Sequence, residues 1–278
     1  MQQITVNQLR NGQVVREGAG VKLTRYIGAD RHNDFEPFLL FDFFDSNDPM
    51  DYIGGFPAHP HRGFETITYL LQGKIRHQDN KGHEGVIGAG DVQWMTAGRG
   101  VIHSEMPMQE DEKRLTGLQL WLNLPAASKL CTPAYHEFTA SQLPVEQHAN
   151  GVIIKVIAGM TVNNTASPII GIETAPLFFD IFIPTTQQCM QVIPATHQAL
   201  IFVLSGELII QQVRVPKATL AVLNLGEELV MQATSSDTRC LLIAAKKLHE
   251  PIARLGPFVM NSDEEIASAL DDFRNNRF

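Results

Sequence analysis

The sequence predicts an all-β protein made of two related β-domains and a short C-terminal helix. Three observations support this prediction. Short apolar runs alternate with Gly, Asn, Asp and Pro, a glycine-centred pattern recurs in both halves, and clear helical periodicity is confined to the C-terminus. At 278 residues the chain is long enough for two domains of ordinary size, each with its own core.

Strands are expected where runs of strand length are rich in Val, Ile, Leu, Phe and Thr. Such runs occupy residues 67–75, 90–98, 115–124, 151–159, 178–184, 199–210 and 218–226. Residues 130–150, "LCTPAYHEFTASQLPVEQHAN", are polar and loop-like, so we interpret them as the linker between the domains. This places the domains at residues 1–135 and 136–278, and we consider an exchange of strands between them.

A helix is expected within residues 261–276, "NSDEEIASALDDFRNN". Ser262 and Glu265 have the spacing of a capping box, which satisfies backbone groups at the start of a helix. Four apolar side chains share one face at helical spacing: Ile266, Ala269, Leu270 and Phe273. We therefore expect this helix to pack back onto the sheets.

An internal repeat supports the two-domain prediction. Aligning "TITYLLQGKI" with "ALIFVLSGEL" matches Gly73 with Gly206, each at the end of an apolar strand. A weaker match pairs Gly90 of "GAGDVQWMTAG" with Gly226 of "NLGEELVMQAT". The spacing within each pair is nearly the same, which indicates that the second half repeats the first.

Composition and charge restrict the class of protein. Apolar residues make up 44% of the chain and charged residues 19%, a globular composition, and the net charge of −8 argues against direct binding to nucleic acid. The first residues lack the pattern of a secretory signal and no apolar run is long enough to span a membrane, so we expect a cytoplasmic protein. Cys131, Cys189 and Cys240 are far apart and are expected to be buried thiols.

Two histidine-rich segments carry the strongest chemical signal. In "GGFPAHPHRGFETITYLLQG", residues 54–73, alternation along a strand places His59, His61 and Glu65 on one face. In "MTAGRGVIHSEMP" the same alternation pairs His103 with Glu105. Imidazole and carboxylate ligands without a thiolate suit iron, manganese, nickel, copper or zinc. Three histidines and one carboxylate leave an open position only on an ion with five or six ligands, which indicates a working site.

The same segments resemble a known family. "HPHRGFETITYLLQGKIRHQD" followed by "GAGDVQWMTAGRGVIHSEMP" resembles the two cupin motifs, and in detail the pirin family of two-domain cupins. "EPFLLFDFF", "GLQLWLNLP" and "HEPIARLGPFVMNSDEEIASALDDFR" extend the resemblance over nearly the whole chain. It implies two tandem double-stranded β-helix (jelly-roll) barrels, with one divalent metal ion, iron, bound by His59, His61, His103 and Glu105. The broader cupin pattern uses Glu65 as a ligand instead, so Glu65 stays an alternative ligand or a residue that orients a ligating histidine.

The second half loses the ligands of the first. The two repeat spacings carry the five candidate positions onto Val192, Pro194, Gln198, Arg239 and Leu241. We therefore expect a C-terminal cupin without metal ligands. In the first domain Phe56 and Trp94 are candidates for lining the pocket, although aromatic residues in β-proteins more often belong to the core. His77 and His83, in a polar hairpin, are expected to be solvated, and His32, His136, His148 and His249 are not expected to be ligands.

Two classes of function follow from the resemblance. As an enzyme, the protein resembles quercetin 2,3-dioxygenases, for which the substrates are a flavonol-like aromatic and dioxygen, with Glu105 as ligand and general base. As a binding protein, it resembles pirins that dock on a protein partner in transcription regulation, with the metal setting conformation or redox state. A zinc hydrolase or a sugar isomerase is a weaker third alternative, because the fold alone does not fix the chemistry.

Overall fold

The chain forms two compact units in the computed structural model, which describes residues 2–28, 35–109 and 113–278. The N-terminal barrel contains Gln13–Ala140 and Leu248–Phe278, and the C-terminal barrel contains Ser141–Lys247 and the chain up to Gly12. The predicted boundary at residue 135 therefore assigned both terminal segments to the wrong unit. Their pairing partners lie far away in sequence, which local patterns do not reveal. His32 lies outside the described residues.

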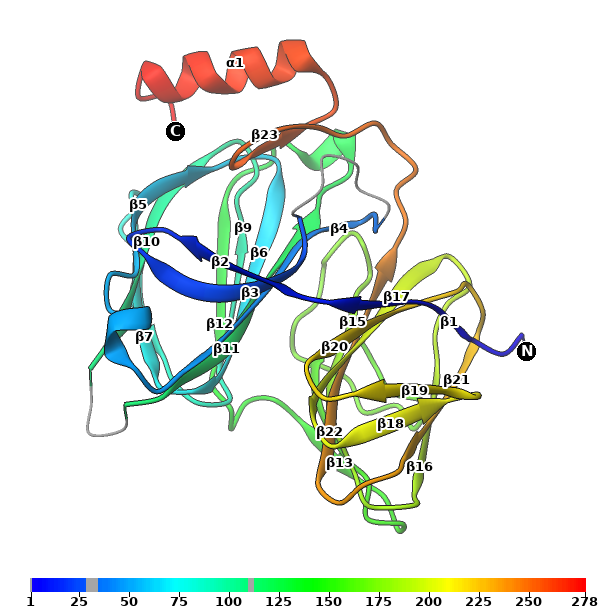
Figure 1. Cartoon of the computed structure of the whole chain (residues 1–278). Helices are drawn as coiled ribbons and strands as arrows, with labels where there is room; N and C mark the ends of the chain where they lie inside the picture. Colours follow the sequence, from blue (N-terminus) through cyan, green and yellow to red (C-terminus); the bar gives the residue numbers. More distant parts are fainter. Residues whose placement is uncertain (1, 29–34, 110–112) are drawn as a thin grey trace. The chain divides into compact units, whose positions relative to one another are not determined.

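The N-terminal barrel is built from a seven-stranded and a four-stranded antiparallel sheet (Figure 1). The first sheet has the order β12 (Ala134–Phe138), β9 (Val92–Thr96), β6 (Phe64–Gln72), β11 (Leu115–Asn123), β4 (Phe38–Ser46), β3 (Val21–Ile27) and β2 (Gln13–Glu17). The second has the order β5 (Phe56–His61), β10 (Val101–Met108), β7 (Lys74–Asp79) and β8 (Glu84–Ile87). Short 3-10 helices are η1 (Pro49–Asp51) and η2 (Ala126–Ser128).

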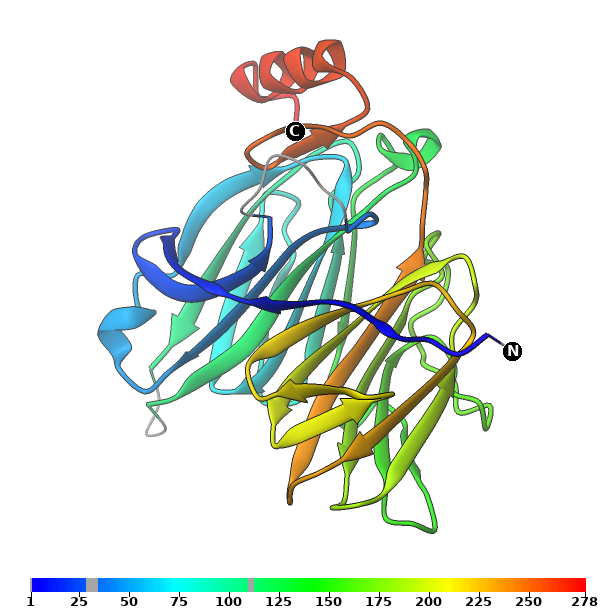
Figure 2. The same ribbon diagram turned by 45° about the vertical axis from the view of Figure 1, so that its right-hand side comes forward.

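The C-terminal barrel repeats this architecture, as Figure 2 shows from a second direction. Its seven-stranded sheet has the order β1 (Val6–Asn11), β20 (Thr219–Leu223), β17 (His197–Ser205), β22 (Thr238–Lys246), β15 (Leu177–Ile183), β14 (Ile153–Ala158) and β13 (Val145–Gln147). Its four-stranded sheet has the order β16 (Gln188–Val192), β21 (Glu228–Ala233), β18 (Glu207–Ile210) and β19 (Val213–Pro216). The prediction of two jelly-roll barrels is confirmed.

The strand pairing confirms one repeat alignment and corrects the other. Gly73 and Gly206 both link a strand of the large sheet to one of the small sheet, and both have positive φ, which glycine adopts without strain. The alignment of Gly90 with Gly226 is wrong, because β9 pairs with β6 as β20 pairs with β17, whereas β21 corresponds to β10. Both runs follow a glycine and are apolar, so their local patterns look alike.

The corrected pairing changes the counterparts of the candidate ligands. His59 and His61 correspond to Gln191 and Ile193, and His103 and Glu105 correspond to Leu229 and Met231, while Glu65 still corresponds to Gln198. Ile193, Leu229 and Met231 belong to a buried apolar cluster that fills the C-terminal barrel. At these positions an apolar interior replaces the polar one of the N-terminal barrel.

The C-terminal segment completes the N-terminal barrel. It forms the hairpin β23 (Ala253–Leu255) and β24 (Phe258–Met260), followed by the helix α1 (Asp263–Arg274). The predicted capping box of Ser262 and Glu265 is present. Ile266 and Ala269 are buried against the β24 side chains, as the prediction that the helix packs back onto the sheets requires. None of the described helices is long and apolar enough to cross a membrane.

The predicted linker is partly strand. β12 pairs with β9 in the N-terminal barrel, and β13 pairs with β14 in the C-terminal barrel. Both are edge strands with largely exposed or half-buried side chains, which explains their polar, loop-like sequence.

Candidate metal centre

Three histidines converge inside the N-terminal barrel. His59 and His61 lie on β5, and β5 pairs with β10 so that His103 stands directly opposite His59. One nitrogen from each imidazole lies within 4.8 Å of the others. The Nε2 atoms of His59 and His103 are 3.1 Å apart. Alternation along the two strands therefore brings the three residues together, as the sequence predicts.

The chemistry of this cluster suits one metal ion. His61 and His103 are each 1% exposed, and both nitrogens of His61 and Nδ1 of His103 have no hydrogen-bond partner among the described residues. A buried polar atom without a partner is costly, and a metal ion relieves that cost for a ligating nitrogen. Nδ1 of His59 lies 2.9 Å from the Pro57 carbonyl oxygen, a contact that fixes a metal-binding imidazole through its other nitrogen.

Burial keeps these imidazoles in the form that binds metals. The pKa of His61 lies well below its ordinary value, first because of burial and then because of His103 and His59. The pKa of His103 is also well below its ordinary value, with burial again the largest cause. Neutral imidazole is the form with a free lone pair, so the site is ready for a cation near neutral pH.

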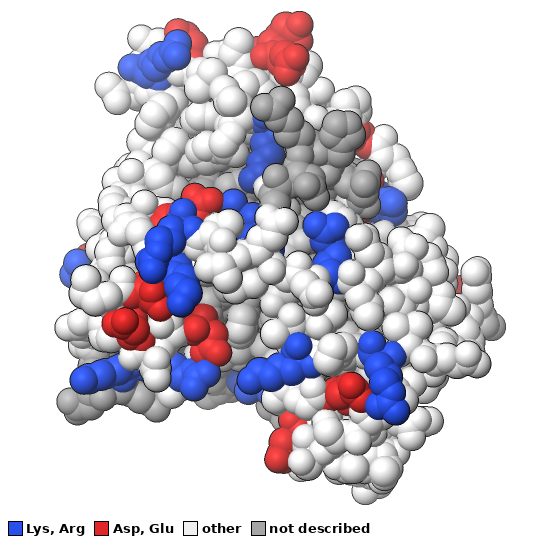
Figure 3. Space-filling view, in the orientation of Figure 1, with Lys and Arg blue, Asp and Glu red and all other residues white. Residues whose placement is uncertain are grey.

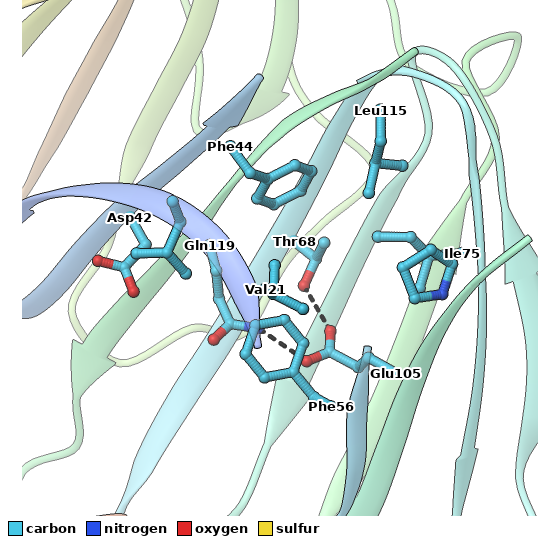
Figure 4. A pocket seen from close by; sticks show the side chains of 11 residues that line it. Val21, Asp42, Phe44, Phe56, Thr68, Ile75, Glu105, Leu115 and Gln119 are labelled. Atoms are coloured by element: carbon cyan, nitrogen blue, oxygen red, sulfur yellow. Dashed lines mark hydrogen bonds between the residues drawn. The ribbon is translucent and has the colours of Figure 1, made fainter. Parts of the chain in front are cut away.

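Glu105 lies beside the histidines but outside their cluster. Thr68 donates a hydrogen bond of 3.1 Å to its Oε1, and Gln119 donates one of 2.9 Å to its Oε2 (Figure 4). The register of β10 against β5 shifts between His103 and Glu105. Glu105 is 3% exposed, and its carboxylate is hydrogen-bonded to side chains of β6 and β11.

Glu65 does not share the strand of the two motif histidines. β5 ends at His61 and β6 begins at Phe64, and the chain turns between them at Gly63, which has φ of +87°. The strand-alternation argument that placed Glu65 with His59 and His61 is therefore wrong. Its buried carboxylate accepts a hydrogen bond of 2.8 Å from Thr96.

The histidines open onto a cavity of about 340 Å³, within the range of roughly 300–1,000 Å³ typical of small-molecule sites. His59, His61, Phe56, Gln119 and Trp121 are among its lining residues. Phe56 and Gln119 also line a smaller adjoining cavity of about 20 Å³ that contains Glu105 (Figure 4). The substrate-sized space thus reaches His59 and His61 directly, and it reaches Glu105 by way of the smaller cavity.

The two aromatic candidates differ in position. Phe56 is half-buried and lines both cavities. Trp94 is 1% exposed and lines neither. It alternates on β9 with Gln93, whose side chain contacts His77, so the indole points to the opposite face of the strand. Trp121 on β11 is the tryptophan that lines the larger cavity, with its ring 5.3 Å from that of His61.

His77 is a buried residue that the sequence prediction placed in solvent. It is 1% exposed and stands opposite Glu105 in the β7–β10 pair. It contacts Gln93 and Glu137, and its ring stacks on Tyr135 at 5.3 Å. Burial lowers the pKa of His77.

A strand-alternation signal for His77 was present in the sequence. Ile75, His77 and Asp79 alternate along β7 and are all buried. His83, in the same hairpin, has a half-exposed side chain and binds Asp79 at 2.7 Å. Treating the whole hairpin as polar therefore hid the inward face of β7.

Both halves of the chain match known protein families. The family described as Pirin matches residues 20–122, and the family described as Pirin C-terminal cupin domain matches residues 178–278. A pirin-like protein of Caulobacter vibrioides is 43% identical over 273 residues, covering 98% of each chain. The chain belongs to the pirin family.

Two further relatives of this pirin-family chain are named for an activity. One, from Pseudomonas aeruginosa, is described as a candidate quercetin 2,3-dioxygenase and is 44% identical, covering 97% of this chain and 96% of its own. The other is a quercetin 2,3-dioxygenase from Acinetobacter baumannii with a known crystal structure. It is 32% identical, and its structure matches with a TM-score of 0.90 over 99% of this chain and 98% of its own. Both span the two cupin barrels, so the resemblance to pirins stated from the motifs is confirmed.

Proposed function

We propose that this pirin-family protein is an iron-dependent dioxygenase that opens flavonols of the quercetin type. The observation that carries the proposal is the cluster of three buried or half-buried histidines, two of which, His59 and His61, line a cavity of about 340 Å³. The names of the two relatives from Pseudomonas aeruginosa and Acinetobacter baumannii support the same substrate class. Manganese, nickel, copper and zinc are alternatives to iron, because mixed imidazole and carboxylate ligands accept them all.

His59, His61, His103 and, when it moves toward them, Glu105 would hold the ion. An iron ion held there would supply the activation of the flavonol and of dioxygen. Phe56 and Trp121 give the larger cavity flat apolar walls for an aromatic substrate.

Glu105 is the proposed general base. Its carboxylate accepts from Thr68 and Gln119, which holds it in the smaller cavity that adjoins the substrate-sized one at Phe56 and Gln119. From this position it takes the proton of the reacting hydroxyl, a role that typically contributes about 10²–10⁴-fold to a rate. Thr68 and Gln119 orient the carboxylate.

The decisive experiment measures turnover with defined metals. The purified protein is loaded without oxygen with iron, manganese, nickel, copper or zinc in turn, air is admitted, and quercetin loss and carbon monoxide release are followed. We expect turnover with iron that disappears in His59→Ala with His103→Ala. The control is His83→Ala, which removes a half-exposed histidine of the same barrel. No turnover with any metal would contradict the dioxygenase proposal and favour the protein-binding alternative.

A further inference from the structure

Arg254 lines the cavity onto which two of the three clustered histidines open. It belongs to β23, in the C-terminal segment that completes the N-terminal barrel, and it lines the same cavity as His59 and His61. The residue as a whole is exposed, while its guanidinium packs against the Leu39 carbonyl oxygen and the Trp121 ring at the cavity wall. The motif search passed over it because it lies far along the chain from both histidine segments.

The position of the guanidinium is fixed by three contacts. Its Nη1 donates to the Leu39 carbonyl oxygen at 3.0 Å and its Nε to the Gly256 carbonyl oxygen at 3.3 Å. Its Cζ lies 5.0 Å from the centre of the Trp121 ring. That ring also contacts His61, at 5.3 Å between ring centres. Trp121 therefore contacts both the guanidinium and the metal-binding group.

The other arginine of the cavity is already paired. Arg25 donates to both oxygens of Asp42, at 2.9 and 2.8 Å, and to Glu17 at 2.8 Å. Basic and acidic side chains lie side by side on the face of the N-terminal barrel seen in Figure 3. By contrast, the hydrogen bonds that Arg254 makes within the described parts of the chain go to neutral carbonyl oxygens. Asp42 and Glu17 interact with Arg254 through space, but neither carboxylate is hydrogen-bonded to it among the described residues, so its outward donors remain open to a ligand.

The cavity as a whole favours an anion. The charges of Arg25 and Arg254 balance those of Asp42 and Glu17 among its lining residues. Imidazoles that bind a metal ion do so as neutral ligands and add no charge, so a bound divalent cation makes the cavity positive. A rigid guanidinium is a strong donor to carboxylate and phenolate oxygens.

We propose that Arg254 determines specificity by binding an anionic oxygen of the substrate, a carboxylate or an ionised phenol, other than the oxygen that the metal would hold. This inference rests on the proposed flavonol dioxygenase function and narrows its substrate class to aromatic compounds that carry a negative charge. The Trp121 ring supports the guanidinium and provides the apolar surface on which the aromatic body lies.

The test compares matched ligands with the iron-loaded protein kept free of oxygen. The ligands are 3-hydroxyflavones that carry a carboxylate on the A ring or on the B ring, each paired with its neutral carboxamide. Dissociation constants are measured from the absorbance change of the bound flavonol. We expect at least one carboxylate to bind about tenfold or more tightly than its carboxamide, the scale of a charge-assisted hydrogen bond.

Arg254→Gln is expected to abolish this preference while leaving carboxamide binding and metal content within about twofold, a margin well inside the tenfold step. Arg114→Gln is the matched control, because it removes one positive charge at an exposed site outside the cavity. Carboxylates and carboxamides that bind equally to the natural protein would overturn the inference, as would a preference that survives Arg254→Gln.

The outcomes also separate the two proposals. A carboxylate preference that depends on Arg254, seen without turnover of any ligand in air, supports the inference and contradicts the dioxygenase function. Turnover of quercetin without any preference for a charged ligand supports the dioxygenase function and contradicts the inference about Arg254. A loss of metal or of thermal stability in Arg254→Gln, with the preference unchanged, assigns Arg254 a structural role and overturns the inference.

Discussion

The Nε2 atoms of His59 and His103 face each other at 3.1 Å across the β5–β10 pair. Two imidazoles at this separation cannot both be protonated at the facing nitrogens without repulsion, so one lone pair at least is directed into the gap. A shared cation satisfies both rings at once. The pairing register of β5 and β10 therefore sets the distance between two of the proposed metal ligands.

Removing either facing histidine is expected to reduce metal affinity. For His59→Ala or His103→Ala we expect a loss of at least about tenfold, because losing a residue that only supports a ligand already costs roughly 10–100-fold. Metal per chain after dialysis, measured by elemental analysis, checks this. His83→Ala should retain the metal, and equal retention by all three variants would contradict the assignment.

Glu105 and Glu65 provide a matched pair of buried acids in one barrel. Glu105→Gln should lower turnover by about 10²–10⁴-fold, because it removes the proposed base, while the histidines keep the metal. Glu65→Gln should leave turnover close to that of the natural protein, since its carboxylate is bound to Thr96. Initial rates and metal content are measured together. Loss of metal in Glu65→Gln alone would make Glu65 the ligand instead.

Local patterns predicted the parts of the site that depend on local alternation. His59, His61 and His103 were found because each pair of motif residues lies on a single strand. Glu65 was misplaced because the chain turns at Gly63 and ends the strand there, whereas a single glycine inside a strand-like pattern can equally mark a bulge. His77 was missed because polar residues surround it in sequence, while its partner Tyr135 is far along the chain.

The fold class followed from composition and periodicity, but the assignment of terminal segments did not. β1 pairs with β20, and Arg254 lies on a hairpin that joins the first barrel near the end of the chain. Such pairings depend on long-range contacts that strand propensity does not encode. Arg254 and Trp121 therefore entered the site only through the structure.

The C-terminus is expected to support metal binding through Arg62, the residue after His61. The Arg62 side chain donates to the Arg99 carbonyl oxygen at 2.6 Å and to Asp272 of α1 at 2.7 Å, and it lies 4.4 Å from the centre of the Phe278 ring. Arg62→Met should weaken metal affinity by about tenfold, at the low end of the effect of residues that orient ligands. Competition with a chromogenic chelator measures this.

Two variants separate this support from general stability. Phe278→Ala should weaken metal binding in the same direction, because it removes the ring against which the Arg62 guanidinium lies. Arg274→Ala changes an exposed residue of the same helix and should have no effect. If Arg62→Met lowers the melting temperature but keeps the metal affinity, Arg62 stabilises the fold without positioning the ligands.

Lys129 gives the stability a predictable pH dependence. Its side chain is 1% exposed, and its Nζ donates to the carbonyl oxygens of Gly63 and Val259 and to Oδ1 of Asn123. Burial lowers the pKa of Lys129 from 10.5 to about 8. Between these values the unfolded chain holds a proton that the folded chain has released, so the free energy of unfolding increases as the pH rises.

The increase should be absent below about pH 8 and complete near pH 10.5, with a size on the order of 3 kcal/mol. Urea unfolding at several pH values measures it, and Lys129→Met should be less stable overall and lack this increase. Lys113→Met, at an exposed lysine, should follow the natural protein. Parallel curves for the natural protein and Lys129→Met would show that the three acceptor oxygens hold the proton on Lys129 against the effect of burial.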